Sequence, residues 1–221
     1  MKQVIIGLLA ALPLLACQPV NQGTPNHTIV KGLARGSESY EVCRANGDAA
    51  DEVVDLRLRN ELGGRTAAFS RFDGPITIRF AQPAPPLAIR DLNRLIARLR
   101  SEAGLNIRLG ANDAPVNIYI HRMPLAKLQN IASNAACLVV PNARNAKEFR
   151  AGWRSGKTQW RNVKTRTLAS VFLPSDQSPQ TERDCLHEEI AQALGPLNDL
   201  YRVSNTVFND DDMNGVLTPY D

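Results

Sequence analysis

Two acidic side chains and an amide near the carboxyl end of the chain have the types and spacing of a small binding site. Glu188 and Gln192 are four residues apart, which makes them neighbours on one face of a helix, and Glu189 stands next to Glu188. Their carboxylate and amide oxygens are groups that hard divalent cations prefer as ligands. We therefore expect this stretch to hold a divalent cation or a water molecule.

The same stretch can be compared with the helix of zinc peptidases. There, His-Glu-x-x-His places two metal-binding histidines one turn apart, and the glutamate activates the metal-bound water. If the pattern begins at His187, Glu188 takes the place of the glutamate, but Ala191 stands at the second ligand position and cannot bind metal. In this alignment His187 would be the only ligand.

A second alignment begins one residue later and fits the spacing of the longer zinc-peptidase motif. The first ligand, general base, second ligand, turn glycine and third ligand then fall on Glu188, Glu189, Gln192, Gly195 and Asn198. None of these ligands is a histidine, and an oxygen-rich set suits a hard cation better than zinc. We predict a degenerate zincin-like site, with Glu189 or Glu188 as the base, rather than a working zinc peptidase.

The carboxyl-terminal segment resembles the domain of unknown function 2927 family of proteobacterial lipoproteins. The matching stretches are CLHEEIAQALGPLND (185–199), LYRV (200–203), VFNDD (207–211) and LTPYD (217–221), and a weaker likeness extends back to about Phe72. The resemblance implies a zincin-like arrangement of helices and sheet with degenerate ligand positions, and it implies no activity. It also implies that members continue past residue 221.

A purely structural role is the alternative for the helix around Glu188. Leu186, Ile190, Ala193 and Leu194 share one face, as in an amphipathic helix that packs on a core and leaves its polar face in solvent. The sequence alone leaves both interpretations open.

The acidic cluster that follows is spaced like a calcium-binding loop. Asp210, Asp212 and Asn214 take positions one, three and five, Gly215 takes position six and Asp221 takes position twelve. Position twelve is usually a glutamate and Pro219 interrupts the loop, so an acidic, solvated turn is the alternative. We keep this cluster as a second candidate cation site.

A basic stretch with two tryptophans suggests a different kind of function. Trp153 and Trp160 alternate with cations, and the stretch contains no acid; the cations are Arg150, Arg154, Lys157, Arg161, Lys164 and Arg166. Such a face suits an anionic lipid or glycan surface or a protein partner. It supports a non-catalytic binding or scaffold protein as the alternative function. The other possibility is a solvated face whose tryptophans belong to the core.

The remaining histidines offer little chemistry. His27 lies in a predicted tether and His121 follows a predicted strand, and neither has a partner at ligand spacing. A meeting of His121 with His187 in space is the one arrangement that would create a site from them.

The elements that must position these residues are those of an α+β domain with a mixed sheet. Apolar periodicity predicts helices over residues 40–62, 89–99, 124–132 and 182–194, and strands over 76–80, 105–109, 116–120, 138–140 and 167–173. Glycines at 63–64, 104 and 195 end three of the helices. We expect helices packed on the sheet around a zincin-like core.

Cysteine placement predicts one disulfide in this domain. Cys137 opens an apolar strand and Cys185 begins the late helix, so both should lie near the core; we expect them to pair, leaving Cys43 free or intermolecular.

The amino terminus has the parts of a bacterial lipoprotein signal. Lys2 precedes an uncharged apolar run that ends Leu-Leu-Ala-Cys at Cys17, too short to span a bilayer comfortably. We predict cleavage after residue 16, acylation of Cys17, a tether over 17–36 and a globular domain over 37–221. Gln18 is not the aspartate that the resemblance to enteric lipoproteins links to inner-membrane retention, so the outer membrane is favoured.

Composition limits the classes of protein and of partner that remain possible. The formal charge is +4 at pH 7 and 43% of residues are hydrophobic, which is ordinary for a globular domain. Neither this charge nor an envelope location suits nucleic acid as a partner. We expect membrane lipid at Cys17, and an envelope peptide, glycan or protein as the partner of the domain.

Overall fold

A computed structural model describes residues 46–59, 64–66, 69–203, 205–209, 214–218 and 220–221, and side chains are described from residue 50. All of these residues belong to one compact unit, 44–221. The predicted signal, Cys17, the tether, Cys43 and the domain boundary at residue 37 lie outside the described residues.

The domain is built on a five-stranded sheet in the order β2-β1-β3-β5-β4. Strands β1 (Ile76–Phe80), β2 (Ile107–Leu109), β3 (Ile118–Met123) and β5 (Ala169–Pro174) run parallel, and β4 (Leu138–Pro141) is antiparallel to β5 at one edge. The predicted α+β class with a mixed sheet is therefore confirmed.

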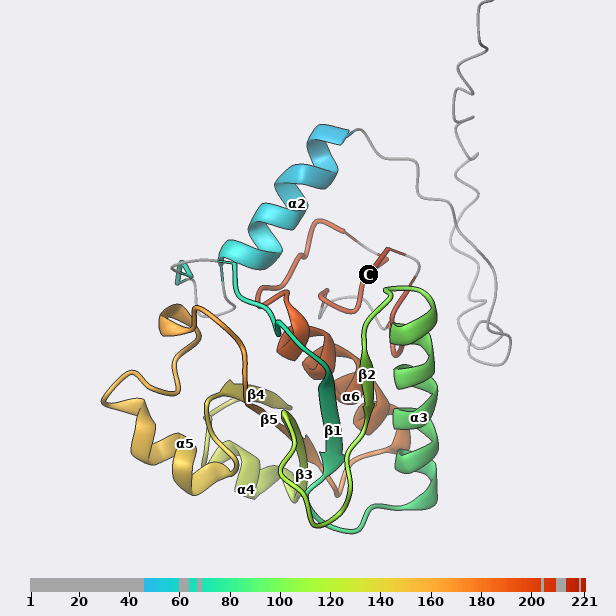
Figure 1. Ribbon diagram of the computed structural model, residues 1–221, viewed down its shortest axis with the longest axis vertical. Coiled ribbons are helices and arrows are strands. Elements are labelled where there is room, and N and C mark those ends of the chain that lie inside the picture. Colours follow the sequence, from blue (N-terminus) through green and yellow to red (C-terminus); the bar gives the residue numbers. More distant parts are fainter. Residues whose placement is uncertain (1–45, 60–63, 67–68, 204, 210–213, 219) are drawn as a thin grey trace, which may run out of the picture. The chain divides into compact units, whose positions relative to one another are not determined.

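Helices lie between most of the strands along the chain and pack against the sheet. They are α2 (Asn46–Leu58), α3 (Pro86–Ser101), α4 (Leu125–Gln129), α5 (Ala146–Trp153) and α6 (Pro179–Leu194), with a short 3-10 helix, η1 (Trp160–Asn162), before β5. Figure 1 shows α3 beside β2 and α4 and α5 gathered at the β4–β5 end of the sheet. Contacts join α6 to α3, β4 and β5.

The two faces of the sheet carry separate apolar clusters, because side chains alternate along each strand. Ile118 and Ile120 of β3 and Val171 of β5 belong to the larger cluster, together with Leu92 and Ile190 of the helices α3 and α6. On the opposite face Phe172 packs with Leu128, Val140 and Phe149, which come from α4, β4 and α5.

Helix α3 illustrates how the sequence positions these elements. Pro86 occupies its first turn, where a missing N–H costs nothing, and Leu92, Leu95, Ile96 and Leu99 are buried at helical spacing. Gly104 follows with a φ of +62°, a left-handed conformation that glycine adopts readily. This prediction from periodicity is confirmed.

Three elements differ from the predictions. Strand β3 ends at Met123 rather than at residue 120, so His121 lies within the strand. The predicted helix over 40–62 is described only as α2. Helix α5 was not predicted; it begins where the Asn145 side chain accepts the Glu148 N–H.

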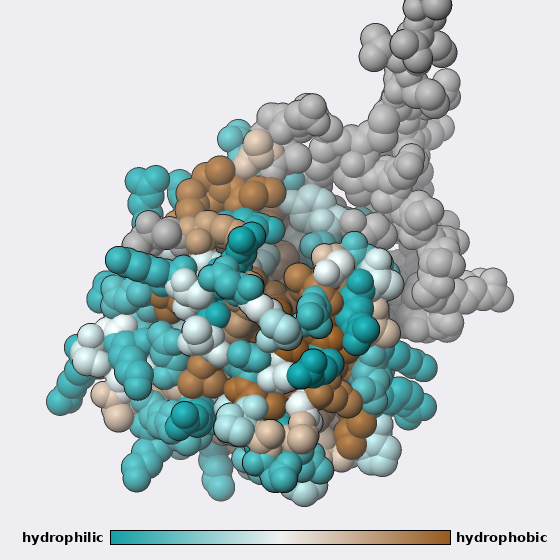
Figure 2. All heavy atoms as spheres, in the orientation of Figure 1, coloured by the Kyte–Doolittle hydropathy of each residue, from teal (hydrophilic) through white to brown (hydrophobic). Residues whose placement is uncertain are grey.

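One exposed apolar area lies on α2. Val53 and Val54 are about half exposed there (49% and 50%), and Figure 2 shows apolar side chains at the surface over this helix. None of the described helices has the length and apolar character that a membrane span requires.

Candidate functional site

Helix α6 presents the polar residues that the sequence singled out. The Ser178 hydroxyl accepts the Thr181 N–H and Pro179 fills the first turn, two features that favour a helix start here. Glu189 and Gln192 are buried, with 5% and 2% of their surfaces exposed, whereas Glu188 is half-buried. The helical spacing places Glu188 and Gln192 on one face, as predicted, and this polar set is surrounded by protein rather than solvated.

Asn198 stands outside this helix. Helix α6 ends at Leu194, Gly195 follows as the C-cap, and Asn198 is half-buried in the segment beyond. Its predicted role as a third ligand remains a prediction. Within the described part of the chain, no group of three or more His, Cys, Asp or Glu side chains is placed to hold a metal ion.

A buried arginine holds the carboxyl end of α6. The Arg166 guanidinium donates to the backbone oxygens of Gln192, Ala193 (2.7 Å) and Gly195 (2.8 Å), and to the Ser70 hydroxyl at 3.0 Å. A cation is favourable at this end of a helix, where carbonyls lack intrahelical partners. Burial and the nearby Arg57 lower the pKa of Arg166 to about 9, so it remains charged at neutral pH.

Arg166 therefore does not belong to the exposed basic face predicted for residues 150–166. Trp160 also points inward: its ring lies 4.6 Å from the Arg166 guanidinium carbon, and its indole N–H donates to the Val139 carbonyl of β4 at 3.2 Å. The prediction of an exposed basic face was wrong for Arg166, because a run of cations without acids does not reveal that one of them is buried against backbone carbonyls. Trp160 agrees with the alternative, in which the tryptophans pack inward.

His187 faces the carboxyl-terminal segment. Its Nδ1 accepts the Leu217 N–H at 3.1 Å, and Arg98 of α3 donates to the Leu217 carbonyl. Burial, with a smaller contribution from Arg98 and Arg183, lowers the pKa of His187 to about 3, so the ring is neutral at physiological pH. One ring nitrogen is thus used to hold a loop in place.

His121 does not meet His187. It stacks on Phe172 at 4.9 Å on the other face of the sheet, its Nε2 lies 2.9 Å from the Arg144 carbonyl, and its Nδ1 lies 3.4 Å from the Gln82 amide nitrogen. Burial lowers the pKa of His121. No two-histidine site is formed by this pair.

The predicted disulfide is present. Cys137 and Cys185 are bonded, with their Cα atoms 5.8 Å apart. The bond joins the residue before β4 to the second turn of α6, so it fixes the edge strand to the helix that carries Glu188 and Glu189.

The predicted calcium loop can be described only in part. Asp210 and Asp212 lie outside the described residues. The Asn214 amide donates to the Thr206 carbonyl at 3.2 Å, and the Asp221 carboxylate accepts hydrogen bonds from the Thr206 hydroxyl and the Val207 and Thr218 N–H groups. Burial raises the pKa of Asp221, although these hydrogen bonds oppose the shift.

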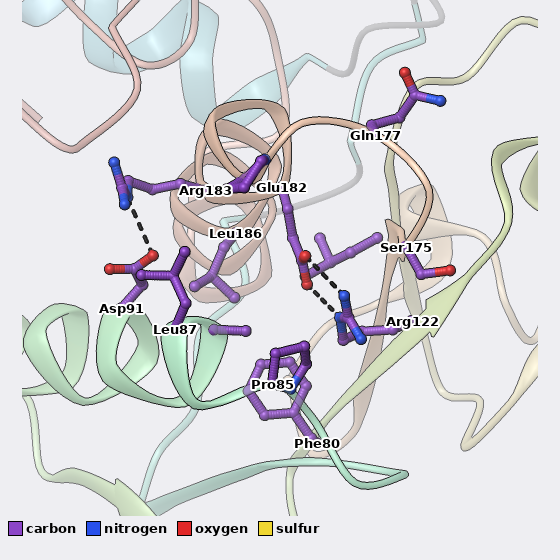
Figure 3. A pocket seen from close by; sticks show the side chains of 13 residues that line it. Phe80, Pro85, Leu87, Asp91, Arg122, Ser175, Gln177, Glu182, Arg183 and Leu186 are labelled. Atoms are coloured by element: carbon purple, nitrogen blue, oxygen red, sulfur yellow. Dashed lines mark hydrogen bonds and ion pairs between the residues drawn. The ribbon is translucent and has the colours of Figure 1, made fainter.

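A pocket of about 230 Å³ opens at the carboxyl ends of β1, β3 and β5. Figure 3 shows two ion pairs on opposite sides of it, Arg122 with Glu182 and Arg183 with Asp91, with Leu87 and Leu186 between them. The Arg122 Nη2–Glu182 Oε2 distance is 2.9 Å and the Arg183 Nε–Asp91 Oδ2 distance is 3.1 Å. No sequence pattern predicted this pocket, because its lining residues come from five separate elements, β1, α3, β3, β5 and α6.

One family model matches this chain over residues 46–221, under the description "Protein of unknown function (DUF2927)". The chain belongs to the DUF2927 family. The match begins with the first residue of α2 and includes the whole sheet, the pocket and α6. No curated protein and no solved structure matched the chain in the same comparisons. Family membership, predicted from residues 185–221, is therefore confirmed, and it extends to all of the described domain.

The DUF2927 domain thus has two polar regions on α6. The amino-terminal half of the helix contributes Glu182 and Arg183 to the pocket, and the carboxyl-terminal half contributes Glu189 and Gln192 to a buried set. Only the second region was recognised from the sequence, by its likeness to a peptidase motif.

Proposed function

We propose that this DUF2927 protein is an envelope lipoprotein, exported, cleaved before Cys17 and held on a membrane by lipid on that cysteine. The Cys137–Cys185 disulfide is the observation that carries the proposal, because disulfides persist in the periplasm and on cell surfaces and are rare in the cytosol. The signal itself is supported by the sequence alone. Two or more acyl chains make such an anchor stable, since each buried methylene contributes about 0.8 kcal/mol.

Metabolic labelling with palmitate in a bacterial host tests the anchor. The wild-type chain should be labelled and sediment with membranes, and the Cys17→Ser variant should carry no label. A Cys43→Ser variant is the matched control and should be labelled like the wild type. Separation of inner and outer membranes should place the protein in the outer fraction. An unlabelled wild-type chain would refute the proposal.

For the domain, we propose a zincin-like site on α6 that has lost zinc-peptidase chemistry. Zinc does not fit the residues present: Glu188, Gln192 and Asn198 include none of the histidines or cysteines that supply most ligands of zinc sites, and the Nδ1 of His187 accepts a backbone N–H. Glu188, Glu189 and Gln192 lie close together on α6, and their carboxylate and amide oxygens are groups that hard divalent cations prefer as ligands, which supports a retained binding role.

Elemental analysis of the domain without its lipid anchor, exported to the periplasm and purified without chelator, tests this proposal. We expect no stoichiometric zinc. Calcium or magnesium that is lost in Glu188→Ala would support a hard-cation site on α6, whereas calcium that this variant retains would direct attention to residues 210–221. Stoichiometric zinc that Gln192→Ala releases would refute the proposal and restore a zinc peptidase.

A second candidate function is a binding or scaffold lipoprotein that uses the remaining basic face. One observation favours it: Trp153 is 45% exposed among five exposed cations, Arg150, Arg154, Lys157, Arg161 and Lys164. Exposed tryptophan beside cations suits an anionic headgroup or glycan.

Co-sedimentation with phosphatidylglycerol vesicles tests this candidate. The mature chain without its acyl group should bind, and changing Arg154, Lys157 and Arg161 to Gln should abolish binding. Changing Arg90, Arg94 and Arg100 of α3 to Gln removes the same charge from another exposed surface and should leave binding intact. Equal losses in both variants would show that net charge alone accounts for binding, and would refute a specific face.

A further inference from the structure

The pocket beside the amino-terminal half of α6 has the position of a ligand site. Phe80, Arg122 and Ser175 belong to or follow the carboxyl ends of three parallel strands, β1, β3 and β5. The chain leaves β1 through α3 to reach β2 on one side, whereas β3 lies on the other side of β1. Open sheets with parallel strands bind ligands at such a point, because the diverging connections leave a crevice outside the strand ends.

The pocket walls retain hydrogen-bonding groups that the protein does not use. Arg122 binds Glu182 through Nε and Nη2, and Arg183 uses Nε for Asp91 and Nη1 for the Gln180 side chain. Among the described residues, nothing accepts from Arg122 Nη1 or Arg183 Nη2, and nothing donates to Asp91 Oδ1. The two arginine side chains are 18% and 23% exposed, so a ligand can reach them.

The floor of the pocket is apolar. Leu87 and Ala88 of α3, Leu173 of β5 and Leu186 of α6 line it, with Phe80 at one end. At about 230 Å³ it is smaller than the 300–1,000 Å³ usual for drug-sized ligands, and it suits one large side chain with its attached polar groups.

We propose that this pocket binds an amino-acid unit with a free carboxylate and an apolar side chain. The carboxylate accepts from the unused Nη1 of Arg122 and Nη2 of Arg183, because hydrogen bonds between a guanidinium and a carboxylate are charge-assisted and strong. The amino-acid nitrogen donates to Asp91 Oδ1, and the side chain covers the apolar floor. The first turns of α3 and α6 also line the pocket, and their dipoles favour the negative end of the ligand.

Two sources supply this chemistry, a free amino acid and the carboxyl end of a peptide. The inference goes beyond the proposed function, since it requires neither the lipid on Cys17 nor the buried set around Glu189. It can therefore fail without affecting either of those proposals.

Calorimetric titration of the mature chain with three probes tests the inference. The probes are leucine, N-acetyl-alanyl-leucine and N-acetyl-alanyl-leucinamide. We expect the leucine or the acetylated acid to bind with a Kd on the order of 1 mM, as befits a small ligand. The leucinamide, which lacks the carboxylate, should bind at least about tenfold more weakly. Tighter binding of leucine identifies a free amino acid as the ligand, and tighter binding of the acetylated acid identifies a peptide end.

The Arg122→Lys variant keeps the charge opposite Glu182 but loses the separate Nη1 donor of the guanidinium, so it should weaken binding of the acid about tenfold. Arg100→Lys, an exposed change at the end of α3, is the matched control and should bind like the wild type. In NMR spectra, the acid should shift the amide resonances of Ala81, Arg122 and Ser175. Equal affinity for acid and amide, no binding of either acid, or shifts confined to other residues would overturn the inference.

Discussion

The guanidinium carbon of Arg166 lies 4.6 Å from the centre of the Trp160 ring, and the same guanidinium binds the last carbonyls of α6. Because the Trp160 indole donates to Val139, this pair connects the edge strand β4 to the carboxyl end of α6. The Cys137–Cys185 disulfide connects the same strand to the amino-terminal half of the helix. Helix α6 is thus attached to β4 at both ends, with Glu188 and Glu189 between the attachments.

Replacing Arg166 should strongly destabilise the domain. Arg166→Met removes a buried cation and leaves the carbonyls of α6 and the Ser70 hydroxyl without their donor, which should lower the free energy of unfolding by about 3 kcal/mol or more. Urea denaturation measures this difference. Arg161→Met, at an exposed position in the same stretch, should change stability by less than about 0.5 kcal/mol. Similar effects of the two changes would contradict the capping role.

The neutral, buried His187 should make the domain sensitive to acid. Its pKa is about 3 in the folded state and about 6.5 in the unfolded chain, so between these pH values the unfolded state binds a proton that the folded state does not. The stability linked to His187 is complete above pH 6.5 and is lost as the pH falls toward 3, by at most about 1.4 kcal/mol per pH unit.

The pH dependence of urea denaturation in wild type and His187→Asn measures this contribution. The Asn oxygen can replace Nδ1 as the acceptor for Leu217, but it does not titrate, so the slope below pH 6.5 should become smaller. His121 should retain a slope of the same sign, since its pKa is also lowered by burial. A slope that is identical in the variant would show that His187 does not titrate as described.

Loss of the disulfide should also destabilise the domain. The bond closes a loop with a sequence separation of 48, for which the loss of chain entropy in the unfolded state is worth about 4 kcal/mol. Denaturation of a Cys17→Ser, Cys43→Ser background should therefore shift markedly on addition of a thiol reductant. The same background with Cys137→Ala and Cys185→Ala should start less stable and show no response. A reductant-insensitive background would mean that the bond does not stabilise the fold.

Tyr220 should hold α2 on the domain. Its hydroxyl donates to Glu52 at 2.7 Å, and only 5% of the Glu52 surface is exposed. Tyr220→Phe removes this donor and should cost about 1–2 kcal/mol, because hydrogen bonds to charged groups are stronger than neutral ones. In this variant, amide hydrogen exchange should become faster in α2 than in the wild type, with less change in β3 and β5. Tyr201→Phe is the control: it removes a hydroxyl that donates to Asp199 at an exposed position, where water can replace the lost bond, so it should cost less.

Local sequence patterns predicted the strands and most of the helices, but not α5, and they predicted few of the contacts between distant segments. The spacing of Leu92, Leu95 and Leu99 predicted α3, and the apolar surroundings of Cys137 and Cys185 predicted their bond. The end of β3 was missed, because its pairing with β5 continues to Met123 and Pro174, past the apolar run. The residue at which a strand ends depends on its pairing with a distant strand, and the periodicity of apolar residues does not reveal this pairing.

The same dependence on distant contacts explains which site residues could be predicted from the sequence. Glu188 and Gln192 were found because both lie on one helix. The pocket was missed because the two partners of each ion pair are far apart in the sequence, by 60 positions for Arg122 and Glu182 and by 92 for Arg183 and Asp91. In the sequence, a charged residue of such a pair looks the same as a charged residue on the solvated surface. Arg166 was misassigned for the same reason: its partners are backbone carbonyls 26 to 29 residues away, which no side-chain pattern reveals.

The hydrogen bond between Tyr220 and Glu52 has a consequence for the order in which the protein matures. These residues are 168 positions apart, so a ribosome that adds about 5–20 residues per second reaches Tyr220 roughly 10–30 s after Glu52. During that interval α2 lacks the hydrogen bond from Tyr220, and proteases or chaperones can reach it. A nascent chain halted before residue 220 should thus be cut in α2, while the completed chain resists.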